Sequence, residues 1–458
     1  MKPQRSLAAL IAVALLAAGC GRSGSSTEES PGGAEPAKAV SFDFGDLKRI
    51  CNKGDAKSSP AQGVTVDTIT VGTLTDMGFT KKSEYVDTAK VFTSWCNEAG
   101  GINGRKIVSK TRDAKLFEVR QRVLEACRED FALVGGGSAF DGTGVKERLS
   151  CLLPDFPGQT VQHEANGSDL QVYPLGAGHS YNRYEGFWRW LLKEAYPSSA
   201  SAIGTITGDS PGPKILTEQG KESITAAGGK VVYSDLHPAG GVADWTPYAQ
   251  SIKNKGVKGL VFYGDFNSLA KLMQALTNIN YKLEWIDANA NAYSSTFVKV
   301  AGKTLDYQNV LLDLSGMYPL ENAAGNPATQ QFVDLFKKYA PGKEPTQPAL
   351  RAFSTWLLFA KAAASCGDAL TRKCVVEAAQ KETRWTAGGL IAPVDLSKKD
   401  TPLKCWNAVK ATSKGFEAAD FKPDSGTYRC DAPAYKYTGT YPKPVTLAAV
   451  GKSPGDVK

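Results

Sequence analysis

One short run between a predicted strand and a predicted helix has the residue types of a nucleophile. The sequence GDSPG at 208–212 fits the G-x-S-x-G pattern of serine hydrolases, in which Ser210 would attack a carbonyl carbon. That pattern stabilises the resulting oxyanion with the backbone N–H of the residue after the serine. Here that residue is Pro211, which has no N–H. No histidine carries a motif that would pair it with Ser210, so we expect no catalytic residues and no enzyme activity.

The first twenty residues have the pattern of an export signal that ends at a modifiable cysteine. A basic start precedes an apolar stretch at 7–18, which is too short to span a bilayer, since that takes about 20 residues. The sequence LAAGC at 16–20 fits the bacterial lipobox, although Ala17 stands where leucine is usual. We therefore expect residues 1–19 to be a signal peptide and Cys20 to be lipidated, which places the protein at the extracytoplasmic face of the cell membrane.

The residues after Cys20 have the composition of a linker. Residues 21–38 are mostly Gly, Ser, Pro, Glu and Ala, with no aromatic side chain, and such a stretch buries too little apolar surface to fold. We expect residues 20–45 to be a lipid anchor and flexible tether. Roughly 420 residues follow, which is too many for one hydrophobic core and predicts two domains.

The charge of the chain gives no sign of a nucleic-acid partner. Lys2 and Arg5 would leave with the signal peptide, which takes two charges off the formal net charge of +8 and leaves +6. The basic residues are scattered along the chain and form no single cluster, so we expect no nucleic-acid binding. No later segment is apolar enough to cross a membrane, and the lipid is the expected contact with it.

Eight cysteines remain beyond Cys20, and an even number in an exported chain favours four disulfides. Cys366–Cys374 is the closest pair in sequence, and Cys405–Cys430 is the next natural one. The other four cysteines allow three connectivities. The chain has no CxxC and its three histidines stand apart, so we expect neither a zinc site nor any other metal or cofactor.

Beyond residue 67, segments with strand patterns alternate with segments with helix patterns. Such alternation implies parallel strands with helical crossovers, and hence an α/β protein. The predicted strands are 68–74, 107–113, 131–134, 152–156, 202–206, 230–233, 259–263 and 283–286. The predicted helices are 83–99, 118–130, 141–149, 181–196, 213–227, 245–255, 267–278, 328–339 and 349–364.

The two sets of elements predict two Rossmann-like lobes with parallel sheets, joined by a hinge. Lobe 1 would comprise 46–178 and 318–400, and lobe 2 would comprise 179–317 and about 401–420. Residues 421–458 would be a disulfide-linked C-terminal extension. Ligands of such sheets bind outside the carboxyl ends of the strands, so facing lobes would enclose a small molecule and close on it by hinge motion.

Five motifs, in this order and spacing, carry a resemblance to a known family. They are ITVGT at 69–73, AGGINGR at 99–105, FALVGGGS at 131–138, FPGQT at 156–160 and ADWTP at 243–247. Over residues 64–417 the chain resembles the substrate-binding proteins of ABC importers, in the leucine/isoleucine/valine-binding group of type 1 periplasmic binding proteins. Its variant is similar to the lipoprotein form of actinobacteria. The resemblance implies the two-lobe fold.

The resemblance also implies which residues bind ligand. In the relatives, hydroxyl and main-chain N–H groups of lobe 1 hold the ligand carboxylate, at the ends of the third and fourth strands. The matching residues in lobe 1 are Asp76, Met77, Ser138, Ala139, Phe140, Gln159 and Thr160. The matching residues in lobe 2 are Ser210, Asp265, Phe266 and Asn289. Two of these also fit a purely local role, since Ser138 suits a turn and Asp265 suits a helix N-cap.

Two residues depart from the pattern of amino-acid binders. Asn289 stands where those relatives have a carboxylate for the ligand ammonium, and a buried ammonium without a counter-ion is costly. Asp265 and Asp287 are the alternative counter-ions. Phe140 replaces a small polar residue. We therefore expect a small polar organic solute, an amino acid or a related compound, and an aromatic or less polar ligand fits better than a branched-chain amino acid.

The predicted topology favours one arrangement of the remaining cysteines. The helices at 118–130 and 141–149 should cover the same face of the sheet, and their carboxyl ends carry Cys127 and Cys151. We expect Cys127–Cys151, which leaves Cys51–Cys96 by elimination.

The sequence thus predicts a monomeric solute-binding protein that passes its ligand to the permease and ATPase of an ABC importer. The alternative is a sensor in which the same lobes signal to a receptor without transport.

Overall fold

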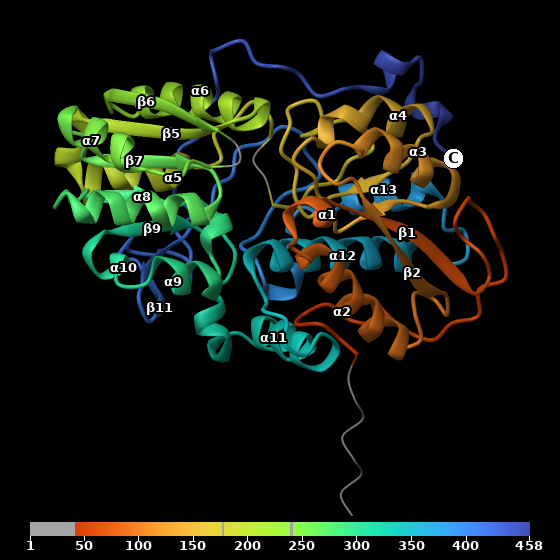
Figure 1. Cartoon of the computed structure of the whole chain (residues 1–458). Helices are drawn as coiled ribbons and strands as arrows, with labels where there is room; N and C mark the ends of the chain where they lie inside the picture. The colour runs from red at the N-terminus through yellow and green to blue at the C-terminus, as the bar shows by residue number, and fades with distance from the viewer. Residues whose placement is uncertain (1–41, 176–177, 239–240) are drawn as a thin grey trace, which may run out of the picture. The chain divides into compact units, whose positions relative to one another are not determined.

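The computed structural model describes residues 42–175, 178–238 and 241–458. The predicted signal peptide at 1–19 and the lipidated Cys20 lie outside the described residues, as does the predicted tether up to residue 41. Residues 42–458 form one unit with two lobes, each built on its own sheet (Figure 1).

Lobe 1 is built on a four-stranded parallel sheet with the strand order β2-β1-β3-β4. The β-branched strand β1 is central, and it pairs with β2 along its whole length, from Thr68 opposite Lys106 to Thr75 opposite Asp113. The elements in chain order are β1 (Thr68–Thr75), α1 (Met77–Thr80), α2 (Glu84–Glu98), β2 (Lys106–Asp113), α3 (Val119–Glu129), β3 (Leu133–Val134), η1 (Asp141–Gly144), α4 (Val145–Ser150) and β4 (Asp155–Phe156).

Lobe 2 is built on a seven-stranded sheet with the order β11-β10-β9-β8-β7-β5-β6, in which the strands from β9 to β6 are parallel. Strand β7, the middle one of the five parallel strands, is buried at every residue, as expected for a strand covered on both faces. The elements are α5 (Glu185–Trp190), η2 (Leu191–Ala195), η3 (Pro197–Ser201), β5 (Ile203–Asp209), α6 (Pro211–Ala226), β6 (Val231–Pro238), α7 (Thr246–Asn254), β7 (Gly259–Tyr263), α8 (Phe266–Asn278), β8 (Trp285–Asp287), η4 (Ala290–Ala292), α9 (Ser295–Ala301), α10 (Thr304–Tyr307) and β9 (Val310–Asp313).

The prediction of parallel strands is wrong at one edge of lobe 2. β10 (Ala408–Thr412) and β11 (Gly415–Ala418) form a hairpin, and β10 also pairs antiparallel with β9. Two residues connect β10 to β11, and so short a connection joins only antiparallel strands. None of β9, β10 and β11 was among the predicted strands, because runs of four or five residues give little periodic signal.

After β9 the chain returns to lobe 1 and adds helices α11 (Pro327–Tyr339), α12 (Gln347–Cys366) and α13 (Arg372–Gln380), the last of which the sequence did not predict. α12 is buried along most of its length and contacts both α2 and α13 (Figure 1). Phe92 of α2 stacks on Trp356 of α12 with ring centroids 5.3 Å apart. This packing places the first turns of α12 beside the carboxyl ends of the lobe 1 strands. The short helices η5 (Leu320–Gly325) and η6 (Ala387–Gly389) flank these elements.

The predicted helix at 181–196 is shorter than expected. α5 begins at Glu185 and gives way to the π-helical turn η2 at Leu191. The residues before it pair with the C-terminal part of the chain instead, because Asn182 N–H donates to the Tyr435 carbonyl at 3.0 Å. That partner lies more than 250 residues away in sequence, so no local pattern reveals it.

Residues 435–458 form a strap that joins the two lobes, as the dark blue segment of Figure 1 shows. On lobe 2, Glu222 of α6 accepts hydrogen bonds from the Tyr435 and Tyr441 hydroxyls at 2.9 and 2.6 Å. On lobe 1, Leu447 is buried beside α4, and its N–H donates to Asp169 at 2.8 Å. Burial disfavours the charged form of Glu222, yet the hydrogen bonds outweigh it and lower the pKa of Glu222 to about 2. The strap ends in η7 (Leu447–Val450) and η8 (Pro454–Asp456).

The predicted tether at 20–45 extends too far. Its last residues belong to the fold, since Phe44 is fully buried and contacts Phe353 of α12 with ring centroids 5.1 Å apart. Gly45 has a φ of 53°, and a Cβ there would lie 1.9 Å from the Gly388 carbonyl oxygen, so no other residue fits this close approach. The stretch with linker composition therefore ends before the aromatic residues that belong to the fold.

All eight described cysteines are joined in the four predicted pairs. The disulfides are Cys51–Cys96, Cys127–Cys151, Cys366–Cys374 and Cys405–Cys430. The first fastens the N-terminal segment to α2, and the second joins the ends of α3 and α4.

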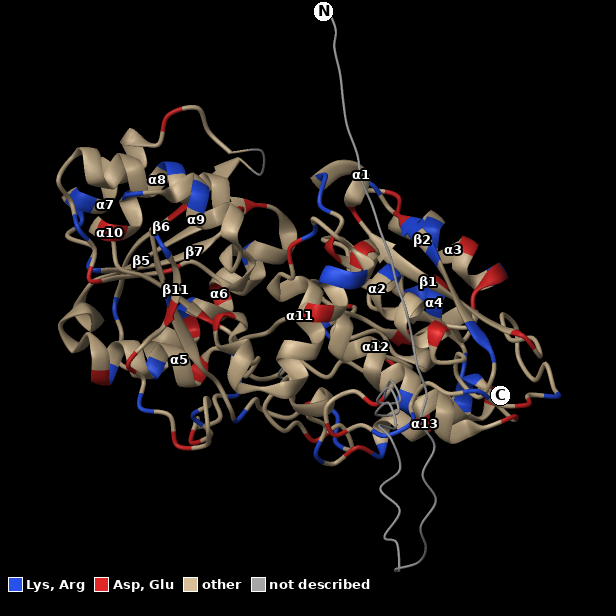
Figure 2. Ribbon diagram, turned by 90° about the horizontal axis from the view of Figure 1, so that it is seen from below, with Lys and Arg blue, Asp and Glu red and all other residues tan. Residues whose placement is uncertain are grey.

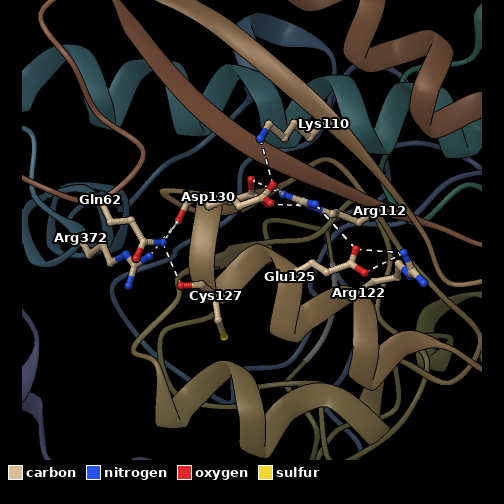
Figure 3. A network of polar contacts seen from close by, with 9 residues as sticks. Gln62, Lys110, Arg112, Arg122, Glu125, Cys127, Asp130 and Arg372 are labelled. Carbon is tan, nitrogen blue, oxygen red and sulfur yellow. Dashed lines mark hydrogen bonds and ion pairs between the residues drawn. The ribbon is translucent and has the colours of Figure 1, made fainter.

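A buried ion pair holds the outer side of lobe 1 together (Figure 3). The guanidinium of Arg112, on β2, donates to both carboxylate oxygens of Asp130 at 2.7 and 2.8 Å. The Asp130 side chain is fully buried. Arg372, at the start of α13, donates to the carbonyl oxygens of Asp130 and Cys151 at 2.8 and 2.9 Å. These contacts bind the returning helices to the sheet.

Charged side chains of both signs are interspersed over the helices and strands of both lobes (Figure 2). Within the described residues, no helix combines the length and apolar character that a membrane span requires.

Candidate functional site

A cavity of about 470 Å³ lies where strands from both sheets end. Lobe 1 contributes the loops after β3 and β4, and lobe 2 contributes the residues after β5, β7 and β8. The first turns of α12, the segment before α5 and Tyr437 of the strap complete the walls. This is the position at which open α/β sheets bind ligands, and the volume is in the range of pockets that enclose small molecules.

Eight of the eleven predicted ligand-binding residues line this cavity. They are Ala139, Phe140, Gln159 and Thr160 in lobe 1, and Ser210, Asp265, Phe266 and Asn289 in lobe 2. The two halves of the predicted site, about 50 residues apart in sequence, therefore meet around one space.

The other three predicted residues, Asp76, Met77 and Ser138, do not line the cavity. The Asp76 carboxylate accepts hydrogen bonds from the Ser138 hydroxyl at 2.9 Å, the Ala139 N–H at 2.8 Å and the Leu116 N–H at 3.0 Å. Met77 begins α1 just beyond it. Two of the donors that the family resemblance assigned to a ligand carboxylate, the Ser138 hydroxyl and the Ala139 N–H, are thus already bound to a carboxylate of the chain itself.

Two polar residues of lobe 2 line the cavity and also accept hydrogen bonds from backbone N–H groups of their own segment. Asp265 is the N-cap of α8, and one of its oxygens accepts from the N–H groups of Asn267 and Ser268 at 3.0 Å. The Asn289 side chain accepts from the Asn291 N–H at 3.0 Å. Asp287, the other predicted counter-ion, is buried outside the lining and accepts from the Trp188 indole N–H at 2.9 Å. Burial raises the pKa of Asp287 to about 6.

Ser210 occupies the N-cap position of α6 and faces the cavity. Among the described residues, no histidine is hydrogen-bonded to its hydroxyl, and Pro211 follows it in the first helical position. The geometry thus lacks both the general base and the N–H donor that acyl transfer by a serine needs.

Two arginines that sequence reasoning missed reach the cavity. Arg351 lies on α12 and is only 5% exposed, and Arg183 precedes α5. Among the described residues, no carboxylate oxygen lies within 4.0 Å of either guanidinium, and the buried Nε of Arg351 has no hydrogen-bond partner. A sequence signal for Arg351 did exist, since it is a lone charge in the first turns of a long apolar helix.

Tyrosines surround Arg183. Tyr184 and Tyr437 line the cavity beside it, and Tyr173 lies close behind. Burial disfavours the charged form of Arg183, but these hydroxyls outweigh it and raise the pKa of Arg183. Burial raises the pKa of Tyr184, while the charges of Arg183 and Arg351 both oppose that rise.

His237, at the end of β6, presents a free acceptor to the same cavity. Its Nδ1 lies 2.8 Å from the Pro238 carbonyl oxygen and so carries the proton, which leaves Nε2 as an acceptor. Nε2 is buried and has no partner among the described residues. A Cβ at Gly264, another lining residue, would lie 2.9 Å from this nitrogen. Glycine at this position therefore leaves the space beside the nitrogen open.

One hydrogen bond crosses the cavity between the lobes. Gln219 of α6 donates its side-chain N–H to Nε2 of His163, in the loop after β4, at 2.8 Å. His163 must be unprotonated at Nε2 to accept it. Burial lowers the pKa of His163 below its ordinary value of 6.5.

We expect this contact to make stability depend on pH. The unfolded chain binds a proton on His163 as the pH falls below about 6.5, whereas the folded chain resists it, so the contribution is full above that pH and is lost below it. The His163→Gln variant does not titrate at this position, so lowering the pH from 7.5 to 5.5 should lower the melting temperature of the wild type relative to that of the variant.

The readout is the difference between the wild-type and His163→Gln curves. Asp141, Asp287 and Asp313 also have pKa values raised by burial, to about 7, 6 and 7, and their contributions cancel in that difference. Parallel curves for the two proteins would contradict the assignment.

Within the described residues, no group of three or more His, Cys, Asp or Glu side chains is arranged to hold a metal ion.

Comparison with known proteins adds a family and a fold. A family model described as periplasmic binding protein matches residues 68–416. A search of curated protein sequences finds no match.

Solved structures with the same fold include three transport proteins. A fatty acid ABC transporter substrate-binding protein from Thermomonospora curvata has a TM-score of 0.66 and 17% identity, and the match covers 86% of this chain and 99% of that one. A leucine-binding protein LivK from Thermotoga maritima has a TM-score of 0.64 and 13% identity, with 77% and 98% covered. LivJ from Streptococcus pneumoniae, solved with isoleucine, has a TM-score of 0.63 and 17% identity, with 77% and 98% covered. Identities this low establish the fold alone.

Proposed function

Because the chain belongs to the periplasmic-binding-protein family, we propose that it captures a small organic solute between its lobes and delivers it to the permease and ATPase of an ABC importer. The observation that carries this proposal is the cavity formed by strand ends of both lobes. Polar residues from both lobes line it beside aromatic ones, and such a mixed lining suits a small organic solute. The two lobes would close on the solute by hinge motion.

We further propose that the protein acts as a monomer at the extracytoplasmic face of the cell membrane, attached through lipidated Cys20. The sequence pattern of residues 1–20 supports the anchor. The first described residues, 42–45, are packed on lobe 1, so the tether would join the fold at this lobe.

The solute is best sought among carboxylates. The fold neighbours are described as fatty-acid-binding and leucine-binding proteins, and one was solved with isoleucine. The cavity has aromatic walls that include Phe140, Trp188 and Phe266, which suit a solute with an apolar body.

Heating the purified chain with a broad library of organic solutes tests the function. A ligand that binds only the folded form, at 100 times its Kd, stabilises that form by about 2.7 kcal/mol. For a chain of this size the melting temperature should rise by about 3 °C. If no solute in the library raises the melting temperature, the proposed function is wrong.

A further inference from the structure

We propose that Arg351 and Arg183 form the anion-binding end of the cavity, and that the solute is an organic carboxylate without an α-ammonium group. This inference rests on the proposed function and specifies its substrate class. It differs from the expectation drawn from the family resemblance, which placed the carboxylate on donors at the ends of the third and fourth strands.

The donors at the end of β3 are not available to a ligand, while the Thr160 hydroxyl, after β4, still lines the cavity. The Ser138 hydroxyl and the Ala139 N–H both donate to the carboxylate of Asp76, which also accepts the Leu116 N–H. A ligand carboxylate at this point would meet Asp76 itself, and two like charges in contact are unfavourable. The negative end of the solute must therefore bind elsewhere in the cavity.

Apart from the exposed Lys82, the two arginines are the cations that line the cavity. A buried guanidinium without a carboxylate is costly, because it has lost its hydration without gaining a counter-ion. The buried acids nearby do not supply one. Asp313 is bonded to the N–H and hydroxyl of Ser315 at 2.8 and 3.0 Å, and Asp287 to Trp188 and Asn289.

The planar guanidinium fork matches a carboxylate, to which it donates two parallel hydrogen bonds. The hydroxyls of Tyr184 and Tyr437 line the cavity near Arg183 and add further donors. The amino-terminal turns of α6 and α12 also lie at the cavity and favour negative charge. A phosphate ester would meet the same donors, and the experiment below separates it from a carboxylate.

The cavity offers no comparable site for a positively charged group of the solute. The described carboxylates in the lining are Glu84 and the exposed Asp265, which already caps α8, and Asn289 stands where amino-acid binders have an acid. A zwitterionic amino acid would bring one positive charge into a cavity that already holds the buried Arg351 and the half-buried Arg183. A carboxylic acid with an apolar body avoids this repulsion.

The test compares matched solutes on the purified chain. Straight-chain and aryl carboxylic acids of four to twelve carbons are titrated beside their α-amino derivatives and beside phosphate esters, with affinity measured by calorimetry. We expect the tightest carboxylic acid to bind at least tenfold more tightly than its α-amino derivative. Tighter binding by the amino acids or by phosphate esters overturns the inference and leaves the proposed function intact. No binding by any solute counts against the proposed function itself.

Substitutions assign the site. Arg351→Met and Arg183→Met should each weaken carboxylate binding about 100-fold. Arg351→Met should also leave the melting temperature of the ligand-free protein unchanged or higher, because it removes an unpaired buried charge. Arg128→Gln, at an exposed arginine of α3 outside the cavity, is the matched control and should bind as the wild type does. Unchanged affinity in both methionine variants overturns the inference.

Discussion

The Arg112→Met variant should lose about 3–5 kcal/mol of unfolding free energy, because it leaves the fully buried Asp130 carboxylate without its cation. Without Arg112, Asp130 either stays charged in an apolar surrounding or takes up a proton and loses two charge-assisted hydrogen bonds. Both outcomes destabilise the folded form. Urea unfolding of wild type and variant at the same pH measures the difference.

The pH dependence gives this prediction a second readout. Burial already raises the pKa of Asp130, against the effect of Arg112, and removing Arg112 should raise it further. A raised folded-state pKa means that the folded form binds more protons than the unfolded form, so stability falls as the pH rises. The deficit of Arg112→Met should therefore be larger at pH 8 than at pH 5.

Arg120→Met provides the matched control. Arg120 pairs with Glu147, but its side chain is 71% exposed, and exposed ion pairs contribute little. Its substitution should cost less than 1 kcal/mol. Equal losses in the Arg112 and Arg120 variants would contradict the role given to burial. The same logic separates Arg112 from Arg351, since only Arg112 has a buried partner whose charge it balances.

Replacing both Cys51 and Cys96 with alanine should cost about 4 kcal/mol. The disulfide closes a loop of 45 residues, and the entropy that a cross-link removes from the unfolded chain grows with loop length. It also fastens the N-terminal segment, to which the proposed tether leads, onto α2. Without it, we expect this segment to detach before the rest of lobe 1 unfolds.

The short disulfide Cys366–Cys374 is the control for loop length. It closes only 8 residues, and its removal should cost about 2.5 kcal/mol in the same chain-entropy model. Guanidinium unfolding of the two double-alanine variants under non-reducing conditions gives both values. The prediction fails if the Cys366–Cys374 variant is the less stable of the two.

Sequence patterns located most of lobe 1 and the parallel strands of lobe 2 because these elements carry their own signal. β1 is a run of β-branched residues, and α2 repeats apolar residues at helical spacing, so period and composition suffice. β10, β11 and α13 were missed because they are short and are stabilised by partners far away in sequence. The four disulfides were predicted because the expected topology left few possible pairings of the cysteines.

The residues of the candidate site also divide into those located from the sequence and those that only the tertiary packing brings to the cavity. The family resemblance assigned Phe140, Gln159 and Ser210 to the ligand, and these residues line the cavity because they follow parallel strands, whose carboxyl ends lie at one edge. Arg183, Arg351 and Tyr437 follow no strand, and only the packing of α12, α5 and the strap brings them there. The order of residues along the chain does not reveal how close these segments lie in space.

The sequence by itself determined the class of fold, the export pattern, the cysteine pairs and the strand ends that line the candidate cavity, because each depends on local period, composition or a topology that parallel strands enforce. Only the tertiary structure decided which donors remain free for the ligand. Asp76 takes the hydroxyl and N–H of the expected carboxylate site, while Arg351 and Arg183 are left without a counter-ion. Hydrogen bonds and charges are satisfied by whatever lies nearest in space, and that depends on how distant segments pack.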